Sequence, residues 1–228
     1  MDRNPCTDED GDVITDPVER DRLGIWTNDV RNDMIAEDAN LYDDDTQVLI
    51  VVRTLQHAAH LKKRLPNFTM VYRAGSLTPQ KHKRFVKQGL ISRRQPFMTD
   101  DRLRKITRAF TRHKLKKAIC TTIWNVGVDF RDLAVLIRGD AGSSPIADVQ
   151  IPGRAVRLGK ETDKEYGLVH DYMDNFHKGF RTKSGSRRNS YERLGFEQEL
   201  PPGYKKRKRK AGEKVTSRNY KQFTDLEE

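Results

Sequence analysis

One glutamine and two arginines between residues 149 and 160 are spaced so that they could act together on a phosphate group. Gln150, Arg154 and Arg157 lie four and then three residues apart, which places them on one face of a helix. A glutamine beside two planar, permanently charged guanidinium groups suits a polyphosphate whose charge grows during transfer, which is the task of an arginine finger. Gly153 lets the backbone approach closely. The spacing fits an exposed basic helix turn equally well, so spacing alone leaves both interpretations open.

The composition indicates one medium domain with extensions. The chain has 228 residues, of which 35% are hydrophobic and 34% charged, and its apolar runs concentrate between about 47 and 172. No run approaches the roughly 18 to 20 apolar residues of a membrane span, and the acidic N-terminus lacks the features of a signal peptide. Cys6 and Cys120 give neither a disulfide framework nor a zinc pattern. We therefore expect a soluble, cytoplasmic protein with no membrane partner and no bound metal.

The net charge of +11 conceals a strong asymmetry along the chain. Residues 1–45 carry fifteen acidic and four basic side chains, a net charge of −11, so the remaining residues carry a net charge of +22. A body of that charge is expected to bind polyanions, and nucleic acid is the usual one. Ribosome-like solvation and simple solubility are also compatible with this balance.

Apolar patterns predict a helix followed by alternating strands and helices. Asp16-Pro17 has the form of a helix start, and apolar residues then recur at helical spacing at Leu23, Trp26, Val30, Met34 and Leu41. Strands are expected at residues 47–53, 68–72, 117–121, 133–137 and 166–170, and helices at 54–65 and 103–110. Continuous apolar strands alternating with helices predict an α/β fold with a parallel sheet covered on both faces.

Ligands of such sheets bind beyond the carboxyl ends of the strands. Thr121, Thr122, Asp140 and the loop around Gln150 would lie there. A polar and basic stretch from 76 to 102 interrupts the pattern. It contains Lys81, Lys83, Arg84, Arg93 and Arg94. These cations fit an insertion that grips a nucleic-acid strand, and a solvated surface excursion is the alternative.

The C-terminal part of the chain becomes basic and loses its apolar pattern from about Asn175. Six consecutive cations begin with Lys205, Lys206 and Arg207. Such a run repels itself and does not pack. We therefore expect residues 201–228 to be largely disordered and to contact nucleic acid.

Three segments, taken in order, resemble motifs of superfamily 2 helicases. Residues 48–52 look like motif IV, residues 120–130 like motif V, and residues 150–157, Gln-Ile-Pro-Gly-Arg-Ala-Val-Arg, like motif VI. The resemblance spans roughly residues 20–175, is closest to bacterial and phage DNA helicases of the restriction and repair type, and rests mainly on motif VI. It implies a second RecA-like motor domain, a parallel sheet flanked by helices.

The resemblance also implies roles for individual residues. Gln150 and Arg154 would face the γ-phosphate of ATP, and Arg157 would stabilise charge in the transition state. Gly127 and Asp129 would lie at the cleft between the motor domains. Thr121 and Thr122 would touch the nucleic-acid backbone, which is DNA or RNA. Pro152 departs from a regular helix at motif VI, because proline inside a helix costs about 3 kcal/mol, so the helix starts or kinks there.

The phosphate loop of a first motor domain is absent from this sequence. Gly-x-x-x-x-Gly-Lys-Ser/Thr occurs nowhere in it. We therefore expect ATP and Mg²⁺ to bind only together with a first RecA-like domain, which is on a separate chain or missing. The chain alone is expected to be inactive as an ATP hydrolase.

Other chemically suggestive residues have simpler explanations. His57 and His60 lie three apart on a helix, but two histidines without further ligands are most often packing or surface groups. Asp171 and Asp174 are expected to be turn or surface residues rather than a nuclease pair. Trp124 and Phe130, which flank motif V, are expected in the core rather than stacked on bases.

Two functions remain after this reasoning. The first is the second motor domain of an ATP-dependent DNA helicase or translocase from a bacterial or phage-infected cell. The second is a non-catalytic basic nucleic-acid-binding protein with a relict helicase fold. In either case we expect an acidic segment with a linker helix at 1–45, the RecA-like domain at 46–175 and a basic extension at 176–228.

Overall fold

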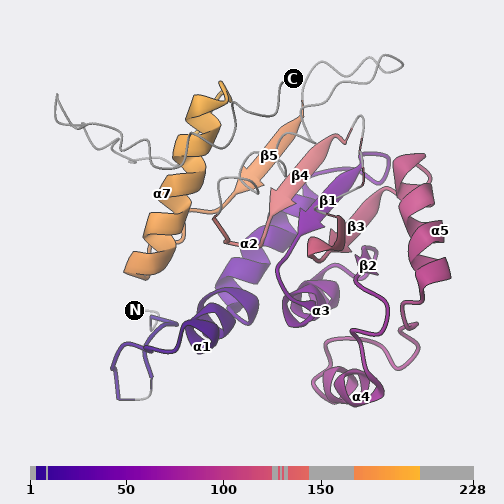
Figure 1. Ribbon diagram of the computed structural model, residues 1–228, viewed down its shortest axis with the longest axis horizontal. Coiled ribbons are helices and arrows are strands. Elements are labelled where there is room, and N and C mark those ends of the chain that lie inside the picture. The colour runs from indigo at the N-terminus through magenta and orange to yellow at the C-terminus, as the bar shows by residue number, and fades with distance from the viewer. Residues whose placement is uncertain are drawn as a thin grey trace, which may run out of the picture. The chain divides into compact units, whose positions relative to one another are not determined.

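The computed structural model describes residues 4–8, 10–124, 128, 130, 133–143 and 167–200 (Figure 1). In chain order its elements are α1 (Pro17–Asp21), the π-helical turn η1 (Arg22–Trp26), α2 (Asp29–Asn40), β1 (Val48–Val51), α3 (Leu55–Arg64), β2 (Thr69–Val71), α4 (Pro79–Lys87), α5 (Asp100–Thr111), β3 (Lys117–Cys120), the 3-10 turn η2 (Thr122–Trp124), β4 (Val135–Arg138), β5 (Leu168–Asp171) and α7 (Lys178–Arg193). One compact unit runs from Met1 to Phe196. The domain boundaries expected at residues 45 and 175 stay predictions.

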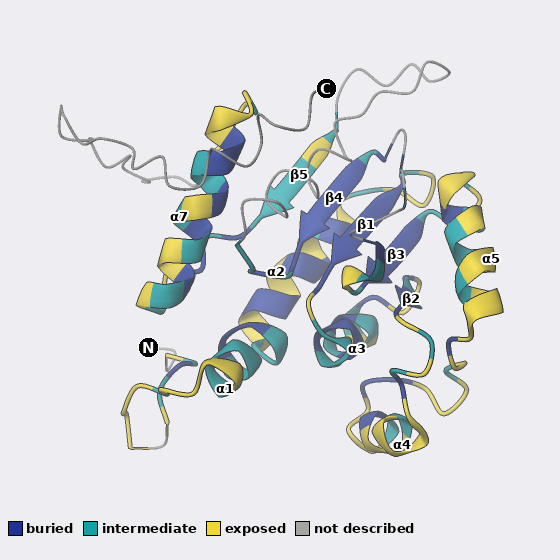
Figure 2. Cartoon of the chain, viewed as in Figure 1, coloured by how far each residue is buried: buried dark blue, intermediate teal, exposed yellow. Residues whose placement is uncertain are grey.

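A parallel sheet of five strands forms the centre of this unit, in the order β2-β3-β1-β4-β5. Val48 at the start of β1 pairs with Lys117 of β3 on one side and with Val135 of β4 on the other. Every residue of β1, β3 and β4 is buried (Figure 2). Central parallel strands are covered on both faces, which explains their unbroken apolar sequence. The predicted α/β fold with a parallel sheet is confirmed.

Side-chain caps begin α1 and α3 where the sequence predicts helix starts, and they also begin α4, which the sequence did not predict, and α5, which starts three residues earlier than predicted. Asp16 Oδ1 accepts a hydrogen bond of 2.7 Å from the backbone N–H of Val18, and Thr54 accepts from that of His57. Thr78 and Thr99 cap α4 and α5 in the same way. Each cap satisfies a backbone donor that the first helical turn leaves unpaired, a contribution of about 1 kcal/mol.

The buried face of helix α2 differs from the face that the spacing of apolar residues predicts. Val30, Met34 and Leu41 are exposed by 62%, 49% and 73%. The buried face instead contains Ile35 and Ala39, together with Ala36, Arg31 and Asn32. The helical register restarts at Thr27, because η1 ends at Trp26 and the side chain of Asn28 caps a new helix. The single helical face suggested by the sequence is therefore divided between two segments.

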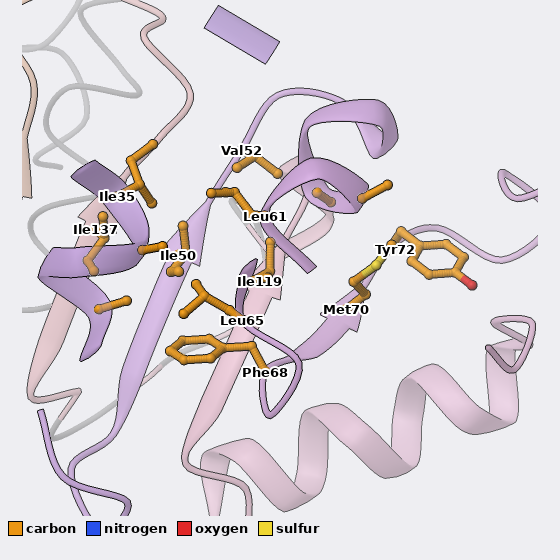
Figure 3. Packing of buried hydrophobic residues seen from close by; sticks show 14 of the residues in the cluster. Ile35, Ile50, Val52, Leu61, Leu65, Phe68, Met70, Tyr72, Ile119 and Ile137 are labelled. Carbon is orange, nitrogen blue, oxygen red and sulfur yellow. The ribbon is translucent and has the colours of Figure 1, made fainter. Parts of the chain in front are cut away.

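Two apolar layers cover the two faces of the sheet. On one face Ile50, Ile119 and Ile137 pack with residues of α2 and α3 and with Phe68, as Figure 3 shows. On the other face Leu49, Val51 and Leu136 pack with Phe110 of α5 and with Trp124 and Phe130. The rings of Trp124 and Phe130 lie 5.1 Å apart by their centroids. The prediction that these two aromatic residues belong to the core is confirmed.

Buried ion pairs fasten α7 to the ends of β4 and β5. Arg187 is 1% exposed and donates from Nε to Asp171 Oδ2 at 2.8 Å. Arg138, which is fully buried, donates to both carboxylate oxygens of Asp140 at 3.1 Å and to the hydroxyl of Tyr191 at 3.0 Å. Burial opposes the charge on Arg138, but Asp140, Tyr191 and Asp171 together outweigh it and raise the pKa of Arg138 above its usual value.

A third buried pair joins α2 to the segment after β5. Arg31 Nε donates to Asp174 Oδ1 at 2.8 Å, and Arg31 Nη1 donates to the carbonyl oxygen of Gly139 at 2.8 Å. The side chains of Arg31 and Asp174 are only 4% and 5% exposed. The expectation that Asp171 and Asp174 are turn or surface residues is therefore wrong, because both carboxylates bind arginines that reach them from remote parts of the chain.

His57 is buried between α3 and α2 and contacts Asn32. Its Nε2 lies 2.9 Å from Asn32 Oδ1, so the ring donates to the amide oxygen. Burial, followed by the nearby charge of Arg31, holds the pKa of His57 well below its usual value. The described residues contain no group of three or more side chains suited to a metal ion. His57 is a packing residue, as expected. Within the same part of the chain, no helix combines the length and apolar character needed to cross a membrane.

Replacing Arg187 should destabilise the fold strongly. Arg187→Ala leaves the carboxylate of Asp171 without its main partner, and removing one member of a buried pair costs about 3 to 5 kcal/mol. Arg181→Ala is the matched control, because Arg181 is exposed on the same helix and donates only to the carbonyl oxygen of Asn175. The control should change the free energy of unfolding by about 0.5 kcal/mol or less. Urea unfolding followed by circular dichroism measures both, and equal losses would refute the role of the pair.

His57 should make the protein sensitive to acid. Its folded-state pKa is below that of the unfolded chain, so the unfolded chain binds the proton first and stability falls as the pH drops below about 6.5. The loss approaches about 1.4 kcal/mol per pH unit for one such group. His57→Gln keeps an amide donor toward Asn32. This variant should lose the part of the pH dependence of the unfolding free energy that His57 causes. Unfolding free energies at pH 7 and pH 5 test this, and parallel profiles for the two proteins would contradict it.

Candidate nucleic-acid and nucleotide interface

The carboxyl ends of the strands form the edge at which parallel sheets bind ligands. In Figure 1 the strand arrows point toward the lower part of the view, where α1 lies. Thr121 follows β3 directly, and its backbone N–H donates to the carbonyl oxygen of Val71 at 2.9 Å. Thr122 begins η2 and is exposed, whereas Thr121 is half-buried. The two threonines lie at the predicted edge, and their contact with a nucleic-acid strand stays a prediction.

The loop after β2 lies at the same edge and is held by its own hydrogen bonds. Gly75 has a φ of +76°, a left-handed conformation that glycine adopts without strain. Ser76 Oγ donates to the carbonyl oxygen of Arg73 at 2.7 Å. Lys81 Nζ, on the first turns of α4, donates to the carbonyl oxygen of Ser76 at 3.3 Å. Lys81 therefore ties α4 to the loop, which also contains the exposed Arg73.

Residues 76–102 fold onto the core rather than forming a solvated excursion. Five apolar side chains of this stretch are buried in the main cluster: Leu77, Phe85, Leu90, Ile91 and Met98. The cations Lys83, Arg84, Arg93 and Arg94 are all exposed. Among the described residues none of these four forms an ion pair. The stretch thus presents basic side chains from a fixed backbone.

The part of the chain that contains α4 and α5 has a large excess of positive charge. Residues 46–128 contain nineteen basic and only two acidic side chains, Asp100 and Asp101. One of these two carboxylates is occupied, because Asp101 pairs with Lys105 at 2.9 Å. A surface of this kind attracts phosphate backbones through long-range electrostatics and released counterions.

Asp140 lies just beyond β4 at the predicted edge, and its carboxylate is used within the fold. Both of its oxygens accept hydrogen bonds from the buried Arg138. Ala141 follows with a φ of +51° and is buried. This turn after β4 therefore helps to hold α7 in place, because Arg138 also binds Tyr191 of α7.

Sequence reasoning missed one charged residue at this edge. Arg53 follows β1, is 57% exposed, and donates from Nη1 to Asp21 Oδ2 at 3.0 Å. Its place after a buried strand is the signal that would have identified it, since the same rule identified Thr121. Its partner Asp21 lies on α1, which no sequence pattern connects to β1.

Several predicted site residues lie outside the described residues. These are Gly127, Asp129, Gln150, Gly153, Arg154, Arg157, Lys205, Lys206 and Arg207. Their roles toward ATP and nucleic acid therefore stay predictions from sequence. Both cysteines belong to the described part, where each is buried and forms no disulfide.

Solved structures with a similar arrangement include helicase domains. The C-terminal domain of the DEAD-box protein Dbp5 matches with 13% identity and a TM-score of 0.49, over 75% of this chain and 82% of that one. A DEAD box protein from Methanococcus jannaschii matches with 16% identity and a TM-score of 0.46, over 73% of this chain and 37% of that one. The Hef helicase domain of Pyrococcus furiosus matches with 12% identity and a TM-score of 0.38, over 63% and 26%. Curated protein sequences give no significant match.

The family model of the helicase conserved C-terminal domain matches residues 32–159, more than half of the chain. The matched range begins in α2, contains β1 to β4 and both threonines at the strand ends, and includes Gln150, Arg154 and Arg157. The match thus covers most of the five-stranded parallel sheet and of the helices that flank it. This chain belongs to the helicase conserved C-terminal domain family.

Proposed function

We propose that this chain is the second motor domain of an ATP-dependent superfamily 2 helicase or translocase that acts on DNA, of the bacterial and phage restriction and repair type. The observation that carries the proposal is the family match over residues 32–159, which includes the strand-end threonines and the Gln150, Arg154 and Arg157 segment in the expected order. A cytoplasmic location belongs to the same proposal.

The proposed division of labour follows from which groups this sequence contains. A first RecA-like domain holds the phosphates of ATP and Mg²⁺, because this sequence has no phosphate loop. This chain contributes Gln150 and Arg154 toward the γ-phosphate and Arg157 toward the charge that develops in the transition state. Gly127, Asp129 and Gly153 line the nucleotide side of the cleft in this proposal. The chain alone therefore binds no nucleotide productively.

Nucleic acid passes along the carboxyl edge in this proposal. The exposed hydroxyl of Thr122 and the loop after β2 supply polar contacts, and the exposed cations of α4 and of the following segment supply charge. Lys205, Lys206 and Arg207 would add contacts from the tail. All of these groups favour backbone phosphates, which DNA and RNA share. The choice of DNA rests on the motif resemblance, and matched DNA and RNA strands would test it.

The second candidate is a basic nucleic-acid-binding protein with a relict motor fold. The missing phosphate loop together with the net charge of +11 favours it. A neighbouring reading frame that encodes a phosphate loop and an Asp-Glu motif would support the motor instead.

Arg157 should control turnover when the first motor domain is present. We expect Arg157→Ala to lower ATP hydrolysis by roughly 10³ to 10⁵ while nucleotide affinity changes little, because a finger acts on the transition state. Arg157→Lys should not restore activity, since a point charge cannot replace the planar fork. Phosphate release by the chain mixed with the neighbouring phosphate-loop protein measures this. The chain alone is the control and should show background release.

Two outcomes would contradict the motor assignment. Robust hydrolysis by the lone chain would show that the phosphates are held here. Unchanged turnover in both Arg157 variants of the complete motor would indicate that residues 150–157 are an exposed basic helix turn with no role in ATP hydrolysis.

The exposed cations of α4 should contribute directly to nucleic-acid binding. We expect Lys83→Gln combined with Arg84→Gln to lower the salt slope for a single strand by about 1.4, which is roughly 0.7 per phosphate contact. The matched control is Lys63→Gln combined with Lys114→Gln, because these exposed lysines lie near the opposite, amino-terminal edge of the sheet. Fluorescence anisotropy across a salt series measures both. Equal salt slopes in the two double variants would mean that the cations of α4 attract nucleic acid only by long-range electrostatics and do not contact phosphates directly.

A further inference from the structure

Four charged residues from three parts of the chain meet near the carboxyl end of β1. Arg20 and Asp21 belong to α1, Arg53 follows β1, and Lys183 lies on α7, whose first turns are near α1 in Figure 1. Asp21 Oδ2 accepts a hydrogen bond of 3.0 Å from Arg53, and Asp21 Oδ1 lies 3.7 Å from Lys183 Nζ. We call these four residues the α1/α7 cluster. The cluster thus combines three cations with one carboxylate, and two of the cations, Arg53 and Lys183, reach that carboxylate.

The hydrogen-bonding capacity of the α1/α7 cluster is only partly used. Asp21 Oδ1 and Arg20 Nε are buried atoms without a hydrogen-bond partner. The neighbouring His177 adds no negative charge, and burial, followed by Arg20 and Lys183, lowers its pKa. Other nearby carboxylates are occupied, because Glu19 binds Arg22 and Asp174 binds Arg31. The cluster therefore keeps an excess of positive charge.

The ratio of cations to anions in the α1/α7 cluster differs from that in the structural ion pairs of the same molecule. Arg31 and Asp174 are one cation and one anion, and both are nearly fully buried. In the α1/α7 cluster Arg53 and Lys183 are 57% and 35% exposed, whereas Asp21 is only 13% exposed. An incoming anion would thus meet the cations before it met the carboxylate. A pair that existed only to hold α1 and α7 together would have no need for the two additional cations.

The position of the cluster connects it to the nucleic-acid edge. Arg53 leaves the sheet at the same end as Thr121, because β1 and β3 are parallel neighbours. The family match covers residues 32–159, so Arg20, Asp21 and Lys183 lie outside it on both sides. Three of the four residues of the cluster therefore lie outside the matched domain, and Arg53 lies inside it.

We propose that the α1/α7 cluster is a phosphate-binding site that extends the nucleic-acid path from the centre of the sheet to α7. Arg20, Arg53 and Lys183 contact backbone phosphates of the strand, and Asp21 is a resident anion that holds Arg53 and Lys183 in place and weakens binding. The proposal rests on the proposed nucleic-acid partner and adds a site and a built-in opposing charge to it.

Charge substitutions in the full chain test the site, because two of them should act in opposite directions. Lys183→Gln and Arg20→Gln should each lower the affinity for a fluorescein-labelled oligothymidylate by roughly fivefold at 0.1 M salt and lower the salt slope by about 0.7. Asp21→Asn should raise the affinity by roughly threefold, since it removes the only carboxylate of the cluster. Damage to the fold would weaken binding in all three variants.

Lys63→Gln is the matched control, because it removes one exposed lysine from the last turn of α3. Its salt slope should equal that of the wild type. Thermal melting verifies that each variant is folded, and Lys183→Gln tests the site even where Asp21→Asn is unstable. If the wild type binds the oligonucleotide but Lys183→Gln keeps its slope, or folded Asp21→Asn binds more weakly, the cluster is a structural contact and the inference fails. If the wild type binds neither DNA nor RNA, the proposed function fails as well.

Discussion

Three buried guanidinium groups determine how the carboxyl end of the sheet is assembled. Arg31, Arg138 and Arg187 bind Asp174, Asp140 and Asp171, and every one of these carboxylates lies at or just beyond the end of β4 or β5. Burying such pairs costs desolvation energy that their attraction roughly offsets, so their value lies in selecting one arrangement. The arrangement that they select brings α2 and α7 against the same strand ends, and it fixes the edge at which ligands of this fold bind.

Charge is distributed unevenly along the chain and around this edge. Acidic side chains are concentrated before residue 46, whereas residues 46–128 are almost purely basic. Where the acidic segment meets the edge, Asp21 partly neutralises the cations around it, while the cations of α4 and of the segment after it have no such partner within the described residues. The edge therefore has a strongly positive side at α4 and a moderated side at α1. A phosphate backbone lying across both sides would be attracted more strongly at α4 than at α1.

The sequence predicted those features that depend on neighbouring residues. Buried parallel strands such as β1 are continuous apolar runs, and caps such as Thr54 are local, so both were readable. The buried face of α2 was not, because Arg31 and Asn32 find their partners in Asp174 and His57, far along the chain. The edge location of Thr121 was predicted from its place directly after a strand. Asp21 beside Arg53 was not, because no periodicity relates a helix end to a distant strand end.

The central position of β1 has a consequence for how the chain folds during synthesis. Both neighbours of β1, the strands β3 and β4, follow it in the sequence, and β3 follows only after three helices and another strand. Pairing between such distant segments is slow, because a long loop must close before any contact forms. Until then β1 exposes apolar side chains and unpaired backbone groups on both sides, which is the state most prone to aggregation. A nascent chain that stalls before β4 therefore carries its most apolar strand with one side unpaired.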